Sequence, residues 1–258
     1  KRQEKNLVLA QEFITKVKKK KPGFHPIGVA HGWSPGSYAD AFQALQKMGY
    51  NYIALGGMVP LKSEQIESCL KKITKIRRKK TRIHLLGISR IEGIASFQKY
   101  GVTSADSTAP LIQAFKSDTH NYHTPERTYI ALRVPQGEGN TKLRKRILSG
   151  QIRQEVARKM EINCMKLLND FQDDNSSIDE VADALCQYEA LVTNKKPTKR
   201  HLYVKTLEDR PWENCDCPIC KELGIHVIIF RGAERNRRRG FHNLYNYYDL
   251  LKSESTTL

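Results

Sequence analysis

The chain has 258 residues, of which 39% are hydrophobic and 28% charged, and its formal net charge is +17. This composition is typical of a water-soluble globular protein with one large domain or two smaller ones. The sequence has no apolar run of about 18 residues, which excludes a membrane-spanning helix. Its first residues also lack the apolar stretch and cleavage site of a secretory signal.

The first hundred or so residues alternate between amphipathic helical patterns and short apolar runs. We expect helices at residues 4–19, 35–48, 64–78 and 91–99. We expect strands at residues 25–32, 50–57, 83–89 and 101–107. Strands and helices that alternate at this spacing predict repeated strand-helix-strand units and a parallel sheet.

One of these helices has signals at both ends. Ser34 is a capping residue, Pro35 stands at the first helical position, and Gly49 follows the last turn. Serine caps, an initial proline and a terminal glycine each favour a helix boundary for a different physical reason. The sequence therefore predicts a helix over residues 35–48.

Each predicted strand ends in small or polar residues. These are His31-Gly32, Gly56-Gly57, Gly87 and Asp106-Ser107. In parallel sheets and α/β barrels, ligands bind at the carboxyl ends of the strands. We therefore expect a ligand site at this edge of the sheet.

The alternation stops after about residue 107. Residues 108–140 look irregular, 143–171 predict one or two long helices, and Ser177 to Glu180 form a capping box that starts another helix. The tail predicts a strand at 225–230 and a final helix over 241–253. We expect three regions: 1–110, a mostly helical basic insertion at 111–205, and a metal-binding subdomain at 206–258.

Half of the six cysteines lie within six residues, at Cys215, Cys217 and Cys220. Thiolates at this spacing suit zinc, which takes four ligands in a tetrahedron. A cluster of iron and sulfur would need a fourth cysteine, and three loose thiols would be reactive. His226 and His242 are the candidates for the fourth ligand. We favour His242 at the start of the final helix, because His226 lies in an apolar run that indicates a core histidine.

With four protein ligands the zinc would be structural and would not take part in catalysis. The remaining cysteines, Cys69, Cys164 and Cys186, lie within helical patterns and are expected to be free thiols. Free thiols suit a reducing compartment, so we expect a cytoplasmic location.

The positive charge is concentrated in five clusters. They lie at residues 16–21, 75–82, 142–146, 195–200 and 235–239. A single cluster is usually a solvated surface, but five in one chain favour a polyanionic partner. Nucleic acid is the first candidate. A membrane surface is the weaker alternative, because no cluster has an amphipathic face with bulky aromatic residues.

The cysteine motif, followed by a His-Asn pair at residues 242–243, resembles that of the tRNA-guanine transglycosylase superfamily. Three other stretches agree with this resemblance: "IALGGMVPL" at 53–61, "HLLGIS" at 84–89 and "GVTSADS" at 101–107. The first is similar to the glycine loop of the family, the second to the strand that lines its base pocket, and the third to the strand that carries its nucleophilic aspartate.

The resemblance implies an α/β fold, the C-terminal half of a TIM (β/α)8-type barrel, with the helical insertion and the zinc subdomain attached. The family's general base lies in the other half, so no residue of this chain inherits that role. The missing half would come from upstream sequence or from another chain. The implied nucleophile is Asp106. The implied base-binding residues are Gly56, Gly57, Met58, Leu86, Gly87 and His31, the last in place of a base-reading glutamine.

More than a hundred residues separate Asp106 from Cys215. This basic insertion resembles the DNA-guanine transglycosylases, and it implies a pentosyltransferase that replaces guanine in DNA with a 7-deazaguanine (preQ0-like) base. Exchange in tRNA is the second alternative. A third is a nucleic-acid-binding subunit without catalytic activity that works beside a catalytic partner.

Overall fold

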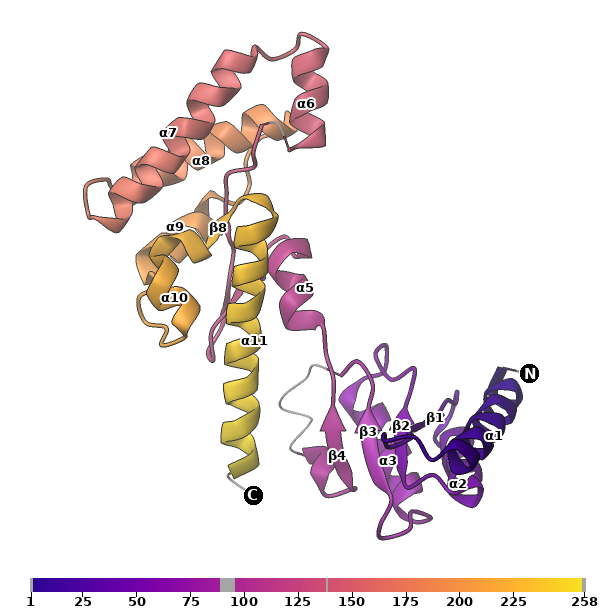
Figure 1. Ribbon diagram of the computed structural model, residues 1–258. Helices are drawn as coiled ribbons and strands as arrows, with labels where there is room; N and C mark the ends of the chain where they lie inside the picture. Colours follow the sequence, from indigo (N-terminus) through magenta and orange to yellow (C-terminus); the bar gives the residue numbers. More distant parts are fainter. Residues whose placement is uncertain (1, 89–95, 138, 257–258) are drawn as a thin grey trace. The chain divides into compact units, whose positions relative to one another are not determined.

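The computed structural model describes residues 2–88, 96–137 and 139–256 (Figure 1). The chain forms two compact units, one containing residues 1–108 and 253–258 and the other containing residues 109–252. The two units divide between residues 108 and 109. The three regions expected from the sequence stay a prediction. Within the described ranges, no helix has both the length and the apolar character needed to cross a membrane.

The first unit contains a four-stranded parallel sheet with the strand order β1-β2-β3-β4 (Figure 1). The strands are β1 (Gly28–Ala30), β2 (Tyr52–Leu55), β3 (Arg82–Leu85) and β4 (Val102–Ala105). The helices are α1 (Arg2–Lys20), α2 (Pro35–Met48) and α3 (Ser63–Thr74). The alternation of strands and helices and the parallel sheet are therefore confirmed.

Helix α2 has the boundaries that its sequence predicts. The Ser34 hydroxyl accepts a hydrogen bond from the backbone N–H of Ser37, and the Ser37 hydroxyl accepts one from the backbone N–H of Ser34. Gly49 follows the helix with φ of +106°, a conformation that side chains with a Cβ rarely adopt. Both ends of this helix are therefore determined by local sequence.

The strands are shorter than expected, and β3 begins one residue before its expected range and ends at Leu85. The helix expected at 91–99 falls largely outside the described residues, and only its end, residues 96–98, is described as helical. The core of this unit consists of apolar side chains from the sheet and the helices. Its fully buried members include Phe42, Leu45, Ile53, Leu55, Ile66, Leu70, Ile83 and Leu85.

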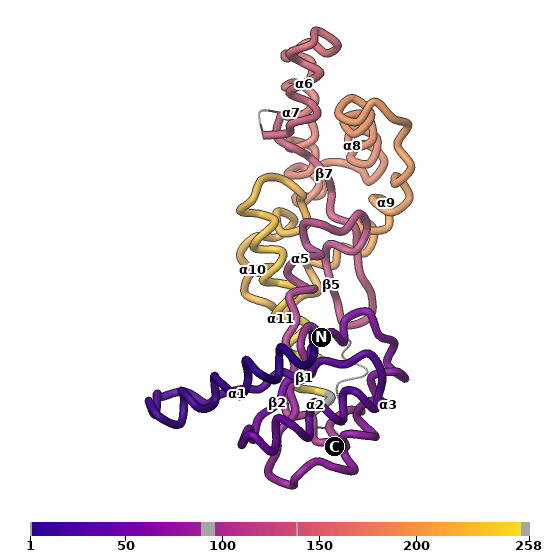
Figure 2. Tube along the Cα trace, turned by 90° about the vertical axis from the view of Figure 1, so that its right-hand side faces the viewer, coloured from indigo at the N-terminus to yellow at the C-terminus, as the bar shows by residue number. Residues whose placement is uncertain are grey.

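The second unit is mostly helical, and Figure 2 follows the chain through it to the yellow C-terminal helix. Its α-helices are α5 (Ala109–Lys116), α6 (Thr141–Leu148), α7 (Gln154–Gln172), α8 (Ile178–Thr193), α9 (Arg200–Asp209), α10 (Pro218–Leu223) and α11 (Gly232–Thr256). The antiparallel pair is β5 (Tyr122–His123) with β6 (Thr128–Tyr129), and the parallel pair is β7 (Leu132–Arg133) with β8 (Ile229–Phe230).

The structure corrects three expectations for this unit. Residues 108–140 are not simply irregular, because they contain α5 and three short strands. Residues 225–230 are not one strand, since the 3-10 helix η1 (Gly224–Val227) precedes β8. The final helix begins at Gly232, so the arginine cluster at 235–239 is helical and His242 lies inside the helix rather than at its start.

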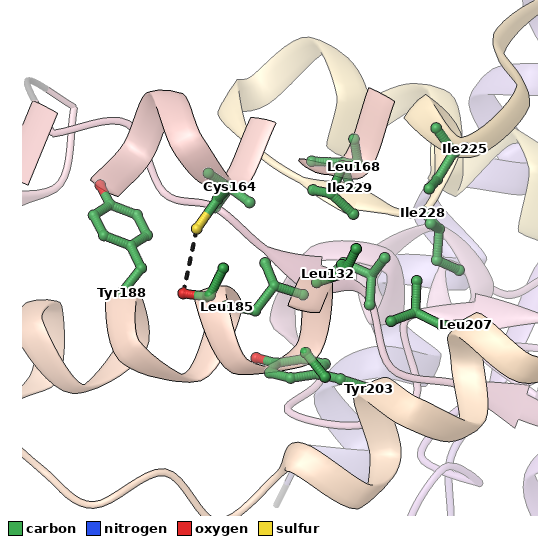
Figure 3. Packing of buried hydrophobic residues seen from close by; sticks show 14 of the residues in the cluster. Leu132, Cys164, Leu168, Leu185, Tyr188, Tyr203, Leu207, Ile225, Ile228 and Ile229 are labelled. Carbon is green, nitrogen blue, oxygen red and sulfur yellow. Dashed lines mark hydrogen bonds between the residues drawn. The ribbon is translucent and has the colours of Figure 1, made fainter. Parts of the chain in front are cut away.

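A single hydrophobic core runs through the second unit (Figure 3). This core contains Leu185 of α8 and Leu207 of α9. It also contains Ile228 and two of the clustered cysteines, Cys217 and Cys220. Cys164 lies within it and donates a hydrogen bond to the Ala184 carbonyl at 3.4 Å. The helical insertion and the cysteine-rich tail therefore share one core.

Candidate active site and metal centre

The carboxyl edge of the parallel sheet brings together residues from all four strands. Strand register pairs Ala30 with Leu55, Leu55 with Leu85, and Leu85 with Ala105. The residues that follow these positions are His31, Gly56, Leu86 and Asp106. Four of the positions expected from the sequence therefore lie in one row along this edge.

Asp106 has two hydrogen-bond donors on the same carboxylate oxygen. Its Oδ1 lies 3.1 Å from His84 Nε2 and accepts the backbone N–H of Gly87 at 3.0 Å. The side chain is 54% exposed. Both donors contact Oδ1, and no described residue donates a hydrogen bond to Oδ2.

The contacts of His84 continue across the sheet. Its Nδ1 lies 2.6 Å from Ser104 Oγ, which also contacts the Tyr52 hydroxyl. Side chains alternate along a strand, so Ser104 and Asp106 share a face, and His84 is the register partner of Ser104. Sequence reasoning missed His84, Ser104 and Tyr52 as site residues. Their polarity in otherwise apolar strands was the available signal.

Gly56 lies under the imidazole of His31. A Cβ added at residue 56 would come within 2.5 Å of His31 Nε2, so any other residue would displace this imidazole. The Gly56 carbonyl accepts the Tyr38 hydroxyl at 2.9 Å, and His31 Nδ1 lies 3.2 Å from Asn6 Nδ2. The glycine lets the exposed imidazole approach the backbone after β2.

Gly57 and Gly87 have positive φ angles of +75° and +73°, which favour glycine. Met58 is fully buried in the core of the unit, so the structure favours its interpretation as a core residue over one that covers a base. Leu86 is half-buried at the sheet edge. Three of the predicted base-binding residues have side chains. His31 is exposed and Leu86 is half-buried, whereas Met58 is buried.

Three cysteines and one histidine form a cluster that could hold a metal ion. The ligand atoms of Cys215, Cys217, Cys220 and His242 all lie within 4.8 Å of one another. His242 Nδ1 lies 3.5, 3.4 and 3.3 Å from the three sulfur atoms, in chain order. His242 itself is completely buried. The imidazole therefore faces all three thiols.

Neighbouring groups orient this histidine. His242 Nε2 donates to the His123 carbonyl at 2.9 Å, which leaves Nδ1 without a proton and able to act as a ligand. The Tyr122 ring stacks on the imidazole with a centroid distance of 3.8 Å. The Tyr122 hydroxyl lies 3.1 Å from Cys220 Sγ, and burial raises the pKa of this phenol, so it stays protonated.

His226, the alternative fourth ligand, lies elsewhere in the second unit. It belongs to η1, and its Nδ1 lies 3.5 Å from a guanidinium nitrogen of Arg235. Burial lowers the pKa of this imidazole. His226 does not belong to the cluster of potential metal ligands, so the sequence-based choice of His242 agrees with the geometry.

Two of the basic clusters are largely used within the protein. Arg239 is completely buried and donates to the carbonyls of Ala114, Val227 and Ile229, while burial lowers the pKa of its guanidinium. Arg238 pairs with Glu222 and Glu234. In the 195–200 cluster, Arg200 pairs with Asp179 and Asp183, and Lys199 with Asp118.

The cluster at 142–146 lies beside an open cleft of about 980 Å³ that α6 and α7 line together with Gln136, Gly137, Gly139 and Arg231. Arg144 and Arg158 border it, and neither guanidinium has a hydrogen bond or an ion pair with any residue that the structure describes. Glu161 in the cleft is neutralised by Arg231 at 2.6 Å. Exposed Leu148 and Ile162 form apolar walls. The cleft thus combines unpaired cations with apolar surface.

No family model matches the chain. Over 254 residues, however, it is 49% identical to a DNA-guanine transglycosylase from Salmonella montevideo. The match includes 97% of this chain but 61% of the relative, so the chain spans about three-fifths of the length of the curated relative that it matches. The resemblance found in the sequence motifs is confirmed, because the chain is a homologue of this protein named DNA-guanine transglycosylase.

Proposed function

We propose that the chain is part of a pentosyltransferase that replaces guanine in DNA with a 7-deazaguanine base through a covalent bond between Asp106 and the sugar. The observation that carries this proposal is the carboxylate of Asp106, exposed at the carboxyl edge of a parallel sheet with one oxygen held by two donors. The 49% identity to a protein named for this reaction in DNA supports the substrate class.

In the proposed reaction, Asp106 Oδ2 attacks C1′ of the target nucleotide. The C1′–N9 bond breaks and its electron pair stays on guanine. The departing guanine takes up a proton and is released as the neutral base. A carboxylate suits this step because it stabilises the cationic character that develops at the sugar. N9 of the incoming base then attacks C1′, loses its proton, and displaces Asp106. Two inversions give net retention.

A second acid/base group must carry the protons of the two bases. By resemblance to the family, it lies outside this chain, in the other half of a (β/α)8 barrel supplied by upstream sequence or another chain. The order β1-β2-β3-β4 of adjacent parallel strands supports the half-barrel interpretation. The backbone at Gly56, Gly57 and Gly87, with Leu86 and His31, would contact the flat base.

The metal that best fits the C-terminal cluster is zinc. Zinc bonds of about 2.3 Å to sulfur and 2.0–2.1 Å to nitrogen in a tetrahedron place sulfur and nitrogen about 3.5 Å apart. The observed distances of 3.3–3.5 Å between His242 Nδ1 and the sulfur atoms agree with this value. Cys215, Cys217, Cys220 and His242 would hold a structural ion that links the α10 region to α11.

The proposed DNA partner must expose C1′ of a paired nucleotide. Flipping a base out of a duplex costs a few kcal/mol, which contacts to the distorted backbone would offset. The α6–α7 cleft supports this role, because Arg144 and Arg158 line it and their guanidinium groups have no ionic partner among the described residues. A cytoplasmic location is also proposed, and the six cysteines, all without disulfides, support it.

The test is incorporation of a labelled 7-deazaguanine base into duplex DNA and into tRNA by the full-length protein. We expect labelled DNA from the wild type and no labelling, or a loss of at least about 10³-fold, with Asp106→Asn, which keeps the shape of the side chain and removes its charge. Denaturing the protein during turnover should leave DNA bonded to Asp106.

Other outcomes of the same assay would contradict parts of the proposal. Labelling of tRNA without DNA would make the tRNA alternative correct. Exchange that survives Asp106→Asn, or an adduct on another side chain, would exclude Asp106 as the nucleophile. A wild-type protein that binds DNA but exchanges no base with its complete barrel present would favour the non-catalytic alternative.

A further inference from the structure

Three polar side chains form a continuous chain of contacts that ends on Asp106. The contacts run from the Tyr52 hydroxyl to Ser104 Oγ, from Ser104 Oγ to His84 Nδ1, and from His84 Nε2 to Asp106 Oδ1. We propose that this relay fixes the Nε2–H tautomer of a neutral His84 and makes His84 the positioning residue for the nucleophile. Its catalytic consequence rests on the function proposed above.

The direction of each hydrogen bond follows from the last contact together with the neutral imidazole that we propose. An ionised carboxylate only accepts hydrogen bonds, so His84 Nε2 must carry the proton that it donates to Asp106. In a neutral imidazole, Nδ1 is then an acceptor, and the Ser104 hydroxyl donates to it. Since this uses the one hydroxyl proton of Ser104, its oxygen accepts from Tyr52.

The Tyr52 ring is itself held in place. The Arg82 guanidinium lies over it, 4.5 Å from the ring centroid, and the Tyr52 and His84 rings meet edge to face at 6.3 Å. The His84 side chain is 15% exposed, against 54% for Asp106. The imidazole, which is mostly buried and bonded at both nitrogens, therefore restrains the exposed Asp106 carboxylate together with the Gly87 N–H.

In the described part of the chain the relay and the Gly87 N–H contact Oδ1, which leaves Oδ2 for the proposed attack. When Oδ2 bonds to C1′, the carboxylate loses its negative charge and Oδ1 becomes a carbonyl oxygen. When the incoming base breaks the Oδ2–C1′ bond, the electron pair returns to the carboxylate. Donors on Oδ1 stabilise that returning charge, so His84 assists the breakdown of the adduct. In the attack, where the charge is lost, His84 acts by holding the carboxylate in position.

This role makes a kinetic prediction that a purely structural role does not. His84→Ala should lower kcat about 10- to 100-fold, as expected for the loss of one hydrogen bond to a charged group, and leave KM for the base nearly unchanged. Because adduct breakdown slows, a larger fraction of the enzyme should be trapped as the covalent Asp106–DNA species. His84→Gln, whose amide nitrogen lies near the place of Nε2, should recover part of kcat.

A measurement without turnover tests the tautomer. In 15N-labelled full-length protein at neutral pH, His84 should show a protonated Nε2 and an unprotonated Nδ1. Ser104→Ala and Tyr52→Phe should increase the population of the other tautomer and lower kcat less than His84→Ala does. His25→Ala, a change at an exposed histidine of the first unit, is the matched control and should change neither readout.

The two readouts separate failure of the relay from failure of the proposed function. An Nδ1–H tautomer or an imidazolium in the wild type overturns the relay whether or not bases are exchanged. If Asp106→Asn abolishes exchange while His84→Ala keeps wild-type kcat and adduct level, the function stands and the relay is wrong. If the wild type shows the Nε2–H tautomer but exchanges no base, the relay geometry stands and the function fails.

Discussion

At the scale of single residues, identical side chains have different roles in this protein. The arginine-rich stretch at 235–239 looks like a nucleic-acid-binding cluster in the sequence. In the structure, however, Arg239 is completely buried and is bonded to main-chain carbonyls, whereas Arg237 on the same helix is exposed. Net charge indicates a polyanionic partner, but only burial and pairing show which cations are free to bind one.

Arg239→Met should destabilise the second unit by about 3 kcal/mol, because it removes donors from several buried carbonyls. Chemical denaturation monitored by circular dichroism measures this loss. Arg237→Met is the matched control, and it should change the free energy of unfolding by less than about 0.5 kcal/mol. Equal stability of the two variants would contradict the structural role of Arg239.

At the scale of elements, local signals predicted boundaries well and short apolar runs poorly. The capping box at Ser177 is present, with Ser177 Oγ accepting from the Glu180 N–H and the Glu180 carboxylate accepting from the Ser177 N–H. The run at 225–230 predicted one strand but forms a 3-10 turn and a two-residue strand. Four to eight apolar residues fit either a strand or a buried turn, and packing decides between them.

Ser177→Ala should lower the free energy of unfolding by about 1 kcal/mol, because it leaves a backbone N–H in the first turn of α8 without its partner. Ser177→Thr keeps the hydroxyl and should retain most of that stability. Thermal or urea unfolding of the three proteins makes the comparison. A stable alanine variant would show that water replaces the cap at no cost.

The cluster of potential metal ligands joins two elements of the second unit. Cysteines around α10 meet His242 on α11, and the same residues border the main core of the second unit. Removal of the ion by a chelator, or Cys217→Ser, should lower the midpoint of thermal unfolding by more than about 10 °C. Metal analysis should give about one zinc per chain in the wild type.

Cys186→Ser is the control for loss of a thiol outside the cluster, and it should keep the metal. A wild-type protein purified without chelator that contains no metal, or a Cys217→Ser variant as stable as the wild type, would contradict the metal assignment.

At the scale of the whole molecule, the excess of positive charge is not evenly available. Several cations in the 195–200 and 235–239 clusters have acidic partners or carbonyls. Arg144 and Arg158, by contrast, border the large cleft without such partners in the described part of the chain. We therefore expect the α6–α7 cleft to provide a main part of the affinity for DNA.

The double variant Arg144→Gln/Arg158→Gln should bind duplex DNA about 10- to 100-fold more weakly at low salt. A plot of log affinity against log salt concentration should also become less steep by about two, since two phosphate contacts are lost. Arg238→Gln, which replaces a guanidinium that already has two glutamate partners, is the control and should change neither quantity. Unchanged binding by the double variant would show that DNA binds elsewhere on the protein.

The sequence by itself determined the features that depend on residues close together in the chain. It predicted the alternating strands and helices, the caps at Ser34 and Ser177, the three clustered thiols and the place of Asp106 after a strand. These features follow from side-chain periodicity, backbone conformation and ligand spacing, which act over a few residues.

Only the tertiary structure decided which distant groups meet. His84 reaches Asp106 because the register of β3 and β4 pairs it with Ser104, and His242 is oriented by the His123 carbonyl from 119 residues away. Arg239 is buried because carbonyls from two other segments converge on it. Such contacts depend on strand register and helix packing, which minimise the free energy of the whole core, so no local pattern in the sequence states which groups will meet.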